Sequence, residues 1–369
     1  MARTNNNAPL KIAIVFGTRP EAIKLFPLIH LLREDPRFAP VVVSTGQHRA
    51  MLDQVLDIAQ VVPDHDLAVM RADQSLDALT ARLLTGIGET LDAESPDWVV
   101  VQGDTASAMC GALAAFYRKI PICHIEAGLR SGDIHHPWPE EVNRKVIGTM
   151  AALHCAPTQT AADALRRENI DPASIHVTGN TVIDALLSVT ARIKDDEALR
   201  REQESLFPFL DAASDPARRL ILVTGHRREN FGAGLERICA ALAELAQRGD
   251  VDIIYPVHLN PNVSGPVRES LGDEPNIHLM EPLDYLPFVY LMDRADLIIT
   301  DSGGIQEEAP SLGKPVVVMR DVTERPEAVE AGTVKLVGTD AVAIVAESAR
   351  LLDNESAYET MSRAHNPYG

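Results

Sequence analysis

The chain has 369 residues, enough for two domains with separate hydrophobic cores, and it carries a formal net charge of −19. This acidic balance argues against nucleic acids and anionic membranes as partners, and no apolar run is long enough to span a bilayer. Four scattered cysteines without a C-x-x-C pair, and no charged-then-apolar leader, lead us to expect a protein of the reducing cytoplasm.

The first half of the sequence alternates short apolar runs with segments of helical periodicity, after a frayed terminus at residues 1–9. We predict strands at Lys11 to Phe16, Val41 to Thr45, Trp98 to Gln102, Ile122 to Ile125 and His154 to Ala156. Continuous apolar runs of this length are typical of parallel strands that are covered on both faces. Between two of them, apolar residues from Leu76 to Leu91 repeat at helical spacing. The alternation predicts a doubly wound parallel sheet.

The sequence changes character after Asn180. The segment from Asp184 to about Ala213 is predicted to be helical and then charged, and Ser214-Asp215-Pro216 is predicted to be a linker. Further strands are predicted at Leu220 to Thr224, Asp252 to Val257, Ile277 to Met280, Leu297 to Thr300, Val316 to Met319 and Val334 to Val337, separated by helices such as Leu235 to Gln247. We therefore predict an α/β chain of two Rossmann-like doubly wound domains facing across a cleft, the GT-B architecture. The expected domains are 1–183 and 184–369, with a linker at about 184–217.

Two of the predicted strands end in tight turns that open a helix. The first turn is Gly17-Thr18-Arg19-Pro20-Glu21, and the second is Asp301-Ser302-Gly303-Gly304. Small residues let backbone N–H groups approach a ligand, and a helix N-terminus favours a phosphate. Glu308 lies one helical turn after Gly304, where it could accept hydrogen bonds from ribose hydroxyls. The pattern points to a nucleotide diphosphate, and a plain strand–helix turn is the alternative.

Three carboxylates follow predicted strands on the side where doubly wound sheets bind ligands. Asp104 follows Trp98 to Gln102, Glu126 directly continues Ile122 to Ile125, and Glu140 comes in the loop after that. The alternatives are an N-cap role for Asp104 and a favourable helix-end position for Glu140. A carboxylate that continues a buried strand is costly without a partner, so Glu126 is the hardest to dismiss as a catalytic group.

An anionic substrate would need a few placed cations in so acidic a chain. The candidates at loops and strand ends are Arg19, Lys24, His226, Arg227, Arg228 and Arg325. His226 follows a strand and precedes a helix, where a histidine can donate to a phosphate and titrate near neutrality. The alternative is a surface histidine in a basic loop. No G-x-G-x-x-G turn is present, so we expect no bound nicotinamide cofactor, and we expect no metal.

Ordered motifs along nearly the whole chain resemble those of the non-hydrolysing UDP-N-acetylglucosamine 2-epimerases. They are Gly17 to Glu21, Gly103 to Thr105, His124 to Arg130, Pro137 to Glu141, Gly179 to Thr181, Gly225 to Asn230, His258 to Pro261, Asp301 to Glu308 and Glu324 to Glu327. The resemblance implies a GT-B enzyme, usually dimeric, that interconverts UDP-N-acetylglucosamine and UDP-N-acetylmannosamine. It also implies a place in cell-surface polysaccharide biosynthesis.

The resemblance implies roles for individual residues as well. The catalytic residues would be Asp104, Glu126, Glu140 and His226. The substrate, with its UDP group, would be bound by Arg19, Lys24, Asp104, Glu126, His226, the backbone of Leu283, Phe288, Ser302, Gly303, Gly304, Glu308 and Arg325. An activating, allosteric substrate site would match Gln47, Arg71, Glu140, Arg227 and His258, with Ala50 where relatives often have a longer polar residue. Relatives continue into a further helix after the point where this sequence ends, at Gly369.

Inverting C2 of the sugar is difficult because its C–H is not next to a carbonyl. An enzyme without a redox cofactor can expel UDP from C1 as a proton leaves C2, which gives 2-acetamidoglucal, and can then re-add UDP. This route needs a base, an acid and cations around the pyrophosphate. Neighbouring carboxylates push their pKa values apart, which leaves one of them able to act as the acid, and the sequence leaves open which one. The alternatives are a hydrolysing epimerase, a GT-B glycosyltransferase and a non-catalytic sugar-nucleotide sensor.

Overall fold

The computed structural model describes residues 8–47, 49–71, 73–212 and 218–369. The chain divides into two compact units, of which the first runs to Ala185 and includes Tyr368 and Gly369, and the second is Leu186–Pro367. The unit boundary thus falls inside a helix, α7 (Thr181–Asp195). The predicted linker at residues 214–216 and most of the predicted frayed terminus lie outside the described residues. Within the described part of the chain, no helix combines the length and the apolar character needed to cross a membrane.

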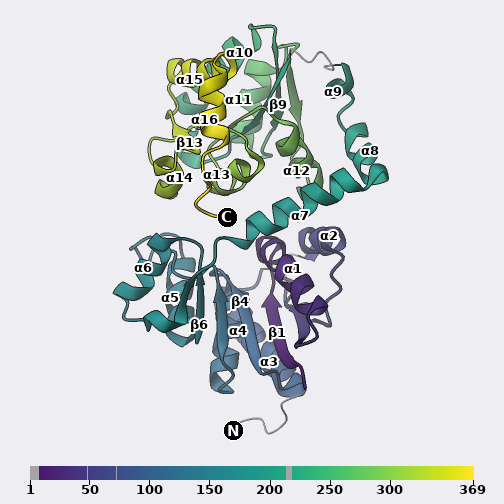
Figure 1. The fold of residues 1–369 in the computed structure, drawn as a ribbon, viewed down its shortest axis with the longest axis vertical. Coiled ribbons are helices and arrows are strands. Elements are labelled where there is room, and N and C mark those ends of the chain that lie inside the picture. Colours follow the sequence, from purple (N-terminus) through teal and green to yellow (C-terminus); the bar gives the residue numbers. More distant parts are fainter. Residues whose placement is uncertain (1–7, 48, 72, 213–217) are drawn as a thin grey trace. The chain divides into compact units, whose positions relative to one another are not determined.

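The first unit is built around one parallel sheet, in which Figure 1 labels β1, β4 and β6. The strand order is β3-β2-β1-β4-β5-β6-β7. Its elements are β1 (Leu10–Phe16), α1 (Arg19–Glu34), β2 (Phe38–Ser44), α2 (Arg49–Ala59), β3 (His65–Asp66), α3 (Leu76–Glu94), β4 (Trp98–Gln102), α4 (Ala106–Tyr117), β5 (Ile122–Ile125), α5 (Glu140–Met150), β6 (Leu153–Ala156), α6 (Gln159–Arg167), the 3₁₀ helix η1 (Pro172–Ser174) and β7 (Ile175–Val177). The strand order reverses between β1 and β4, and ligands bind in the crevice at such a switch point in folds of this kind.

The second unit repeats the plan with a parallel sheet of order β10-β9-β8-β11-β12-β13. After α7 come α8 (Glu197–Ser205), α9 (Pro208–Ala212), β8 (Arg219–Thr224), η2 (Arg228–Asn230), α10 (Ala233–Ala246), β9 (Val251–Pro256), α11 (Pro261–Leu271), β10 (Ile277–Met280), α12 (Tyr285–Arg294), β11 (Leu297–Thr300), α13 (Gly303–Glu308), η3 (Ala309–Leu312), β12 (Val316–Val318), α14 (Pro326–Glu330), β13 (Val334–Leu336), α15 (Ala341–Asp353) and α16 (Glu355–Ser362). Its switch point lies between β8 and β11.

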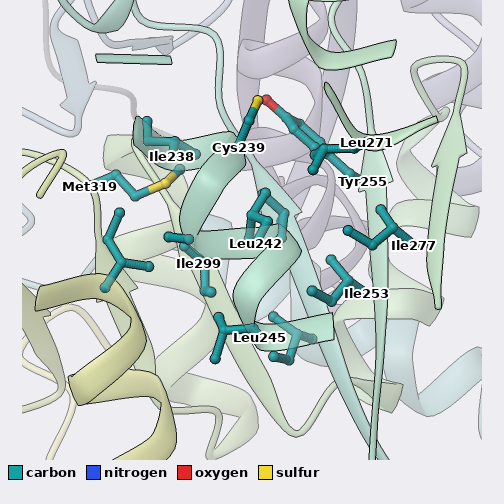
Figure 2. Packing of buried hydrophobic residues seen from close by; sticks show 14 of the residues in the cluster. Ile238, Cys239, Leu242, Leu245, Ile253, Tyr255, Leu271, Ile277, Ile299 and Met319 are labelled. Carbon is teal, nitrogen blue, oxygen red and sulfur yellow. The ribbon is translucent and has the colours of Figure 1, made fainter. Parts of the chain in front are cut away.

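Apolar side chains on one face of each helix and on the strands form the two cores. In the second unit, Ile238, Leu242 and Leu245 of α10 pack against strand residues such as Ile253 and Ile299 (Figure 2). In the first unit, the periodic leucines of α3 pack with the alanines of α4 over the central strands. Strands that are rich in β-branched residues and buried on both faces suit a parallel sheet. The predicted fold class of two Rossmann-like domains is confirmed.

Four strands, β4, β5, β10 and β11, have the predicted bounds, and the other predicted strands begin or end a few residues away. Two strands were not predicted, β3 (His65–Asp66) and β7 (Ile175–Val177). Both lie at the edges of the first sheet, where a strand has one partner, and both are too short to show an apolar run. The sequence therefore predicted the buried centre of the sheet better than its edges.

Candidate active site

Asp104 and Glu126 follow adjacent strands of the first unit. Gln102 at the end of β4 pairs in register with Ile125 at the end of β5, so the residues just beyond them emerge at the same edge of the sheet. Both carboxylates line a cavity of about 180 Å³ with Lys24 and Arg144. The cavity lies beside the switch point between β1 and β4. The first sheet therefore brings together two of the three carboxylates and one of the predicted cations.

Glu126 is held in an unusual backbone conformation. Its φ of 61° lies in the left-handed region, which few non-glycine residues adopt. The side chain is only 7% exposed, and its Oε2 accepts hydrogen bonds from Lys24 Nζ and from Gln102 Nε2. These two donors offset the cost of burying the carboxylate. Residues kept in sparsely populated conformations cluster at functional sites, which fits a catalytic use of this side chain.

Asp104 is not the N-cap of the following helix. Thr105 has that role, because its Oγ1 accepts a hydrogen bond of 3.0 Å from the Ala108 N–H at the start of α4. The Asp104 carboxylate instead accepts hydrogen bonds from Nε and Nη2 of Arg144. Burial raises the pKa of Asp104, the Arg144 guanidinium opposes the rise, and the negative charges of Glu126 and Glu140 add to it.

Glu140 occupies the first turn of α5, where a negative charge interacts favourably with the helix dipole. It is half-buried and close enough to Asp104 to influence the pKa of that carboxyl, although it does not line the cavity of about 180 Å³. The catalytic and the helix-end interpretations are therefore both compatible with its position.

A buried glutamate that the sequence did not single out ties two turns together. Glu21 is 1% exposed, and its Oε2 accepts hydrogen bonds from the Gly17 and Thr18 backbone N–H groups. Its Oε1 accepts a hydrogen bond of 2.7 Å from Thr105 Oγ1. Burial raises the pKa of Glu21, and these hydrogen bonds oppose the rise. The carboxylate thus connects the turn after β1 to the turn that carries Asp104.

The turn after β1 requires glycine at its first position. A Cβ on Gly17 would lie 2.1 Å from Thr45 Oγ1 and 2.3 Å from Ser107 Oγ, which is closer than atoms can approach. Arg19 follows as the first residue of α1 and is half-buried. Gln47, a predicted activating-site residue, accepts a hydrogen bond of 3.2 Å from the same Ser107 Oγ. The side chain of Ala50 lies outside the described residues.

In the second unit, two loops meet at the switch point between β8 and β11. Asp301 follows β11, is 1% exposed, and accepts backbone hydrogen bonds from His226 (2.9 Å) and Arg227 (2.8 Å) in the loop after β8. The His226 ring stacks on the His258 ring, with centroids 5.6 Å apart. Arg227 is paired with Glu324 at 2.7 Å. The loop with the predicted phosphate-binding histidine is thus anchored to the loop that opens α13.

The start of α13 has the features expected of an anion site. Ser302 is the N-cap residue, and its side chain makes no capping hydrogen bond within the described part of the chain. A Cβ on Gly304 would lie 3.4 Å from Glu308 Oε1, so that carboxylate lies close to Gly304, which is exposed, as its spacing predicted. Arg325, at the N-cap of α14, forms an ion pair with Glu307 of α13.

The remaining predicted residues are spread over both units. Leu283 precedes α12 and Phe288 lies in its first turn, and both are half-buried. Arg71 lines a separate cavity of about 450 Å³ in the first unit, together with His65 and Arg82, rather than the cavity with Asp104. No group of histidine, cysteine, aspartate or glutamate side chains in the described ranges has an arrangement that could hold a metal ion.

Sequence reasoning missed the partners of the predicted carboxylates. Arg144, Gln102 and Glu21 line the cavity with Asp104 and Glu126. Arg144 lies four residues after Glu140 and on the same helical face, a spacing that relates it to Glu140 and not to Asp104. Gln102 is a polar residue at the end of a buried strand, which was an available signal.

The comparisons with known proteins agree over nearly the full length. A family model described as UDP-N-acetylglucosamine 2-epimerase matches residues 30–369. The UDP-N-acetylglucosamine 2-epimerase of Salmonella typhimurium is 57% identical over 361 residues, which cover 98% of this chain and 95% of the relative. The enzyme of that name from Escherichia coli K12 is 56% identical over 361 residues, with the same two coverages.

Solved structures are similar in fold as well as in sequence. The UDP-GlcNAc 2-epimerase from Neisseria meningitidis bound to UDP-GlcNAc is 46% identical, with a TM-score of 0.85, 98% of this chain covered and 96% of that chain. The UDP-GlcNAc 2-epimerase from Methanocaldococcus jannaschii, in complex with UDP-GlcNAc and UDP, is 33% identical, with a TM-score of 0.75 and the same coverages.

Proposed function

The chain belongs to the UDP-N-acetylglucosamine 2-epimerase family, and from this premise we propose that it reversibly epimerises UDP-N-acetylglucosamine at C2 to UDP-N-acetylmannosamine. The reaction would proceed by elimination of UDP, through 2-acetamidoglucal, and re-addition. The observation that carries the proposal is the pairing of Asp104 and Glu126 in one cavity with Lys24 and Arg144. Two carboxylates beside cations meet the need for an acid, a base and charge stabilisation.

The two carboxylates differ in a way that suits different roles. Lys24 and Gln102 both donate to Glu126 and hold its carboxylate in the cavity, so we assign it the role of base. Burial and the charges of its carboxylate neighbours raise the pKa of Asp104, so we assign it the role of acid. In this scheme Arg144 holds the Asp104 side chain in place.

The UDP group is assigned to the second unit, with contributions from the first. The first turn of α13 at Ser302, Gly303 and Gly304 would hold the pyrophosphate, and Glu308 would accept from the ribose. The other proposed contacts are His226, Arg325, Phe288, the backbone of Leu283, Arg19 and Lys24. The proposal extends to a homodimer, to substrate activation through Gln47, Arg71, Glu140, Arg227 and His258, and to the cytoplasm as the compartment. Free cysteine thiols at four positions support a reducing compartment.

Proton NMR in deuterated water tests the reaction itself. The full-length protein is incubated with UDP-N-acetylglucosamine without added NAD, and the signal at C2 is followed. We expect both epimers to accumulate, with deuterium from the solvent at C2. Release of one UDP per sugar, with free N-acetylmannosamine as the main product, would assign the protein to the hydrolysing class. Retained C2 hydrogen in all products would contradict the elimination route.

A further inference from the structure

The two carboxylate oxygens of Asp301 have different surroundings. Oδ2 accepts three hydrogen bonds, from the His226 and Arg227 backbone N–H groups and from Asn230 Nδ2 at 3.2 Å. Oδ1 is buried and accepts no hydrogen bond from the described residues, but it lies 3.5 Å from His226 Nδ1. Leaving a buried carboxylate oxygen unsatisfied is costly, so a donor is expected at this position. Among the residues that the structure describes, His226 Nδ1 is the ring nitrogen in an ion-pair arrangement with it.

A second contact to the His226 ring is made through its flat face, by stacking. The His258 ring stacks on it with an interplanar angle of 15°. The Asn260 N–H donates to His258 Nδ1 at 3.1 Å, so that nitrogen acts as an acceptor. The two adjacent cations are matched by two anions, because Arg227 pairs with Glu324 and Arg320 pairs with both Glu324 and Glu229. These contacts leave Asp301 as the anion that faces His226 Nδ1 in the described part of the site.

We propose that Asp301 is a positioning residue for His226, which donates Nδ1–H to the buried Oδ1 and thereby presents Nε2 to the substrate pyrophosphate. This inference rests on the proposed function. Nε2 is the ring nitrogen that does not face Asp301, and the His226 side chain is 45% exposed, which leaves part of it open to a ligand. When the pyrophosphate binds, the ring takes one proton from solvent and becomes an imidazolium between two anions. The Asp301 carboxylate faces the other nitrogen of the ring and holds it in place, and no bond of the substrate changes in this step.

Nitrogen NMR of the histidine rings shows directly which ring nitrogen of His226 carries a proton. The full-length protein is labelled with ¹⁵N, and the His226 signals are assigned by their loss in His226→Asn. We expect the free protein to carry the ring proton on Nδ1, and the complex with UDP to carry protons on both nitrogens. A free protein with the ring proton on Nε2 would overturn the proposal, and this result needs no Asp301 variant to fold.

Asp301→Asn gives the complementary result. The three donors around Oδ2 should keep the amide oxygen there, which puts the amide nitrogen at the position of Oδ1. The His226 ring should then accept at Nδ1 and carry its proton on Nε2, in the free protein and in the UDP complex. Asn230→Ala is the matched control, because it removes a donor from the Oδ2 side and should leave the protonation of the ring unchanged. A ring unaffected by Asp301→Asn would contradict the proposal.

Calorimetry with UDP tests whether Asp301 positions the His226 ring or only anchors the loop that carries it. Asp301→Asn should weaken UDP binding about tenfold, the scale of one charge-assisted hydrogen bond, and should cause no further loss in a His226→Asn background. An equal loss in both backgrounds would mean that Asp301 only anchors the loop, which would refute the inference. Absence of UDP binding by the wild-type protein would instead refute the proposed function, while the NMR result for the free protein would still stand.

Discussion

At the scale of single residues, the Glu126 side chain combines a left-handed backbone, deep burial and a pairing with Lys24. Glu126→Gln keeps the shape and most of the hydrogen bonding but removes proton transfer. Turnover should fall about 100- to 10,000-fold, the usual share of a general base, while UDP affinity stays within a few-fold. Steady-state kinetics and calorimetry measure the two quantities. Glu94→Gln, a carboxylate paired with Lys11 away from the cavity, serves as the control and should be near normal. Near-normal turnover in Glu126→Gln would mean a structural carboxylate.

The pKa of His124 is lowered mainly by the burial of its ring. The ring is fully buried, Nε2 donates to the Gly103 carbonyl at 2.7 Å, and burial lowers the pKa of His124 from 6.5 to about 4. Because the folded-state pKa is below the unfolded value, its stabilising contribution is present above pH 6.5 and is lost as the pH falls toward 4. His124→Gln can keep the donor without titrating. We expect the free energy of unfolding, measured with urea, to fall between about pH 7 and about pH 4.5. This fall should be about 2 kcal/mol smaller in the variant than in the wild-type protein. An identical pH dependence in both proteins would refute this.

The contacts that Arg144 and Glu21 make in the site could not be predicted from the sequence. Asp104 and Arg144 are 40 residues apart, and Glu21 reaches Thr105 over 84 residues, so only the folded sheet brings them together. The carboxylates themselves were predictable, because each follows a strand whose apolar run ends visibly. The residues that contact each carboxylate depend on how the helices between the strands pack. The lengths of these connections do not reveal which helix lies next to which loop.

At the scale of elements, the start of α4 combines two interactions in one hydroxyl group. Thr105 Oγ1 caps the helix and also donates to the buried Glu21 carboxylate. Thr105→Ala should therefore cost about 2 kcal/mol of the free energy of unfolding, about half for the cap and half for the lost hydrogen bond. Asp340→Ala, which removes the N-cap of α15, is the control and should cost about 1 kcal/mol. Urea unfolding compares them, and an equal cost would show that the contact with Glu21 contributes nothing.

The elements also show why the sheet centres were predictable and the edges were not. The central strand β4, Trp98–Gln102, contains three consecutive valines and is buried along most of its length. β3 is the dipeptide His65–Asp66, whose strand conformation comes from pairing with β2 rather than from its own residues. Pattern arguments detect an element when its own side chains need burial, and they miss it when a neighbouring strand imposes it.

At the scale of the whole molecule, the proposed chemistry and the proposed nucleotide binding reside in different units. Asp104 and Glu126 belong to the first sheet, and Glu308 and Ser302 belong to the second. This division predicts that variants of the first unit mainly change turnover and that variants of the second unit mainly change UDP affinity. The charge of −19 adds a condition, because an anionic substrate must be attracted by a few local cations against the field of the whole chain.

Glu308→Ala tests the division from the side of the second unit. Its Oε1 lies close to Gly304 in the first turn of α13, where a ribose hydroxyl would donate to it. Losing one charge-assisted hydrogen bond should cost roughly 1.5–3 kcal/mol, which is about ten- to hundredfold in UDP affinity by calorimetry. Turnover at saturating substrate should change far less than in Glu126→Gln, because no proton-transfer group is lost. Glu359→Ala, a carboxylate paired with Arg363 on α16, is the matched control and should bind UDP normally. Unchanged UDP affinity in Glu308→Ala would remove the nucleotide from the start of α13 and would require another binding surface.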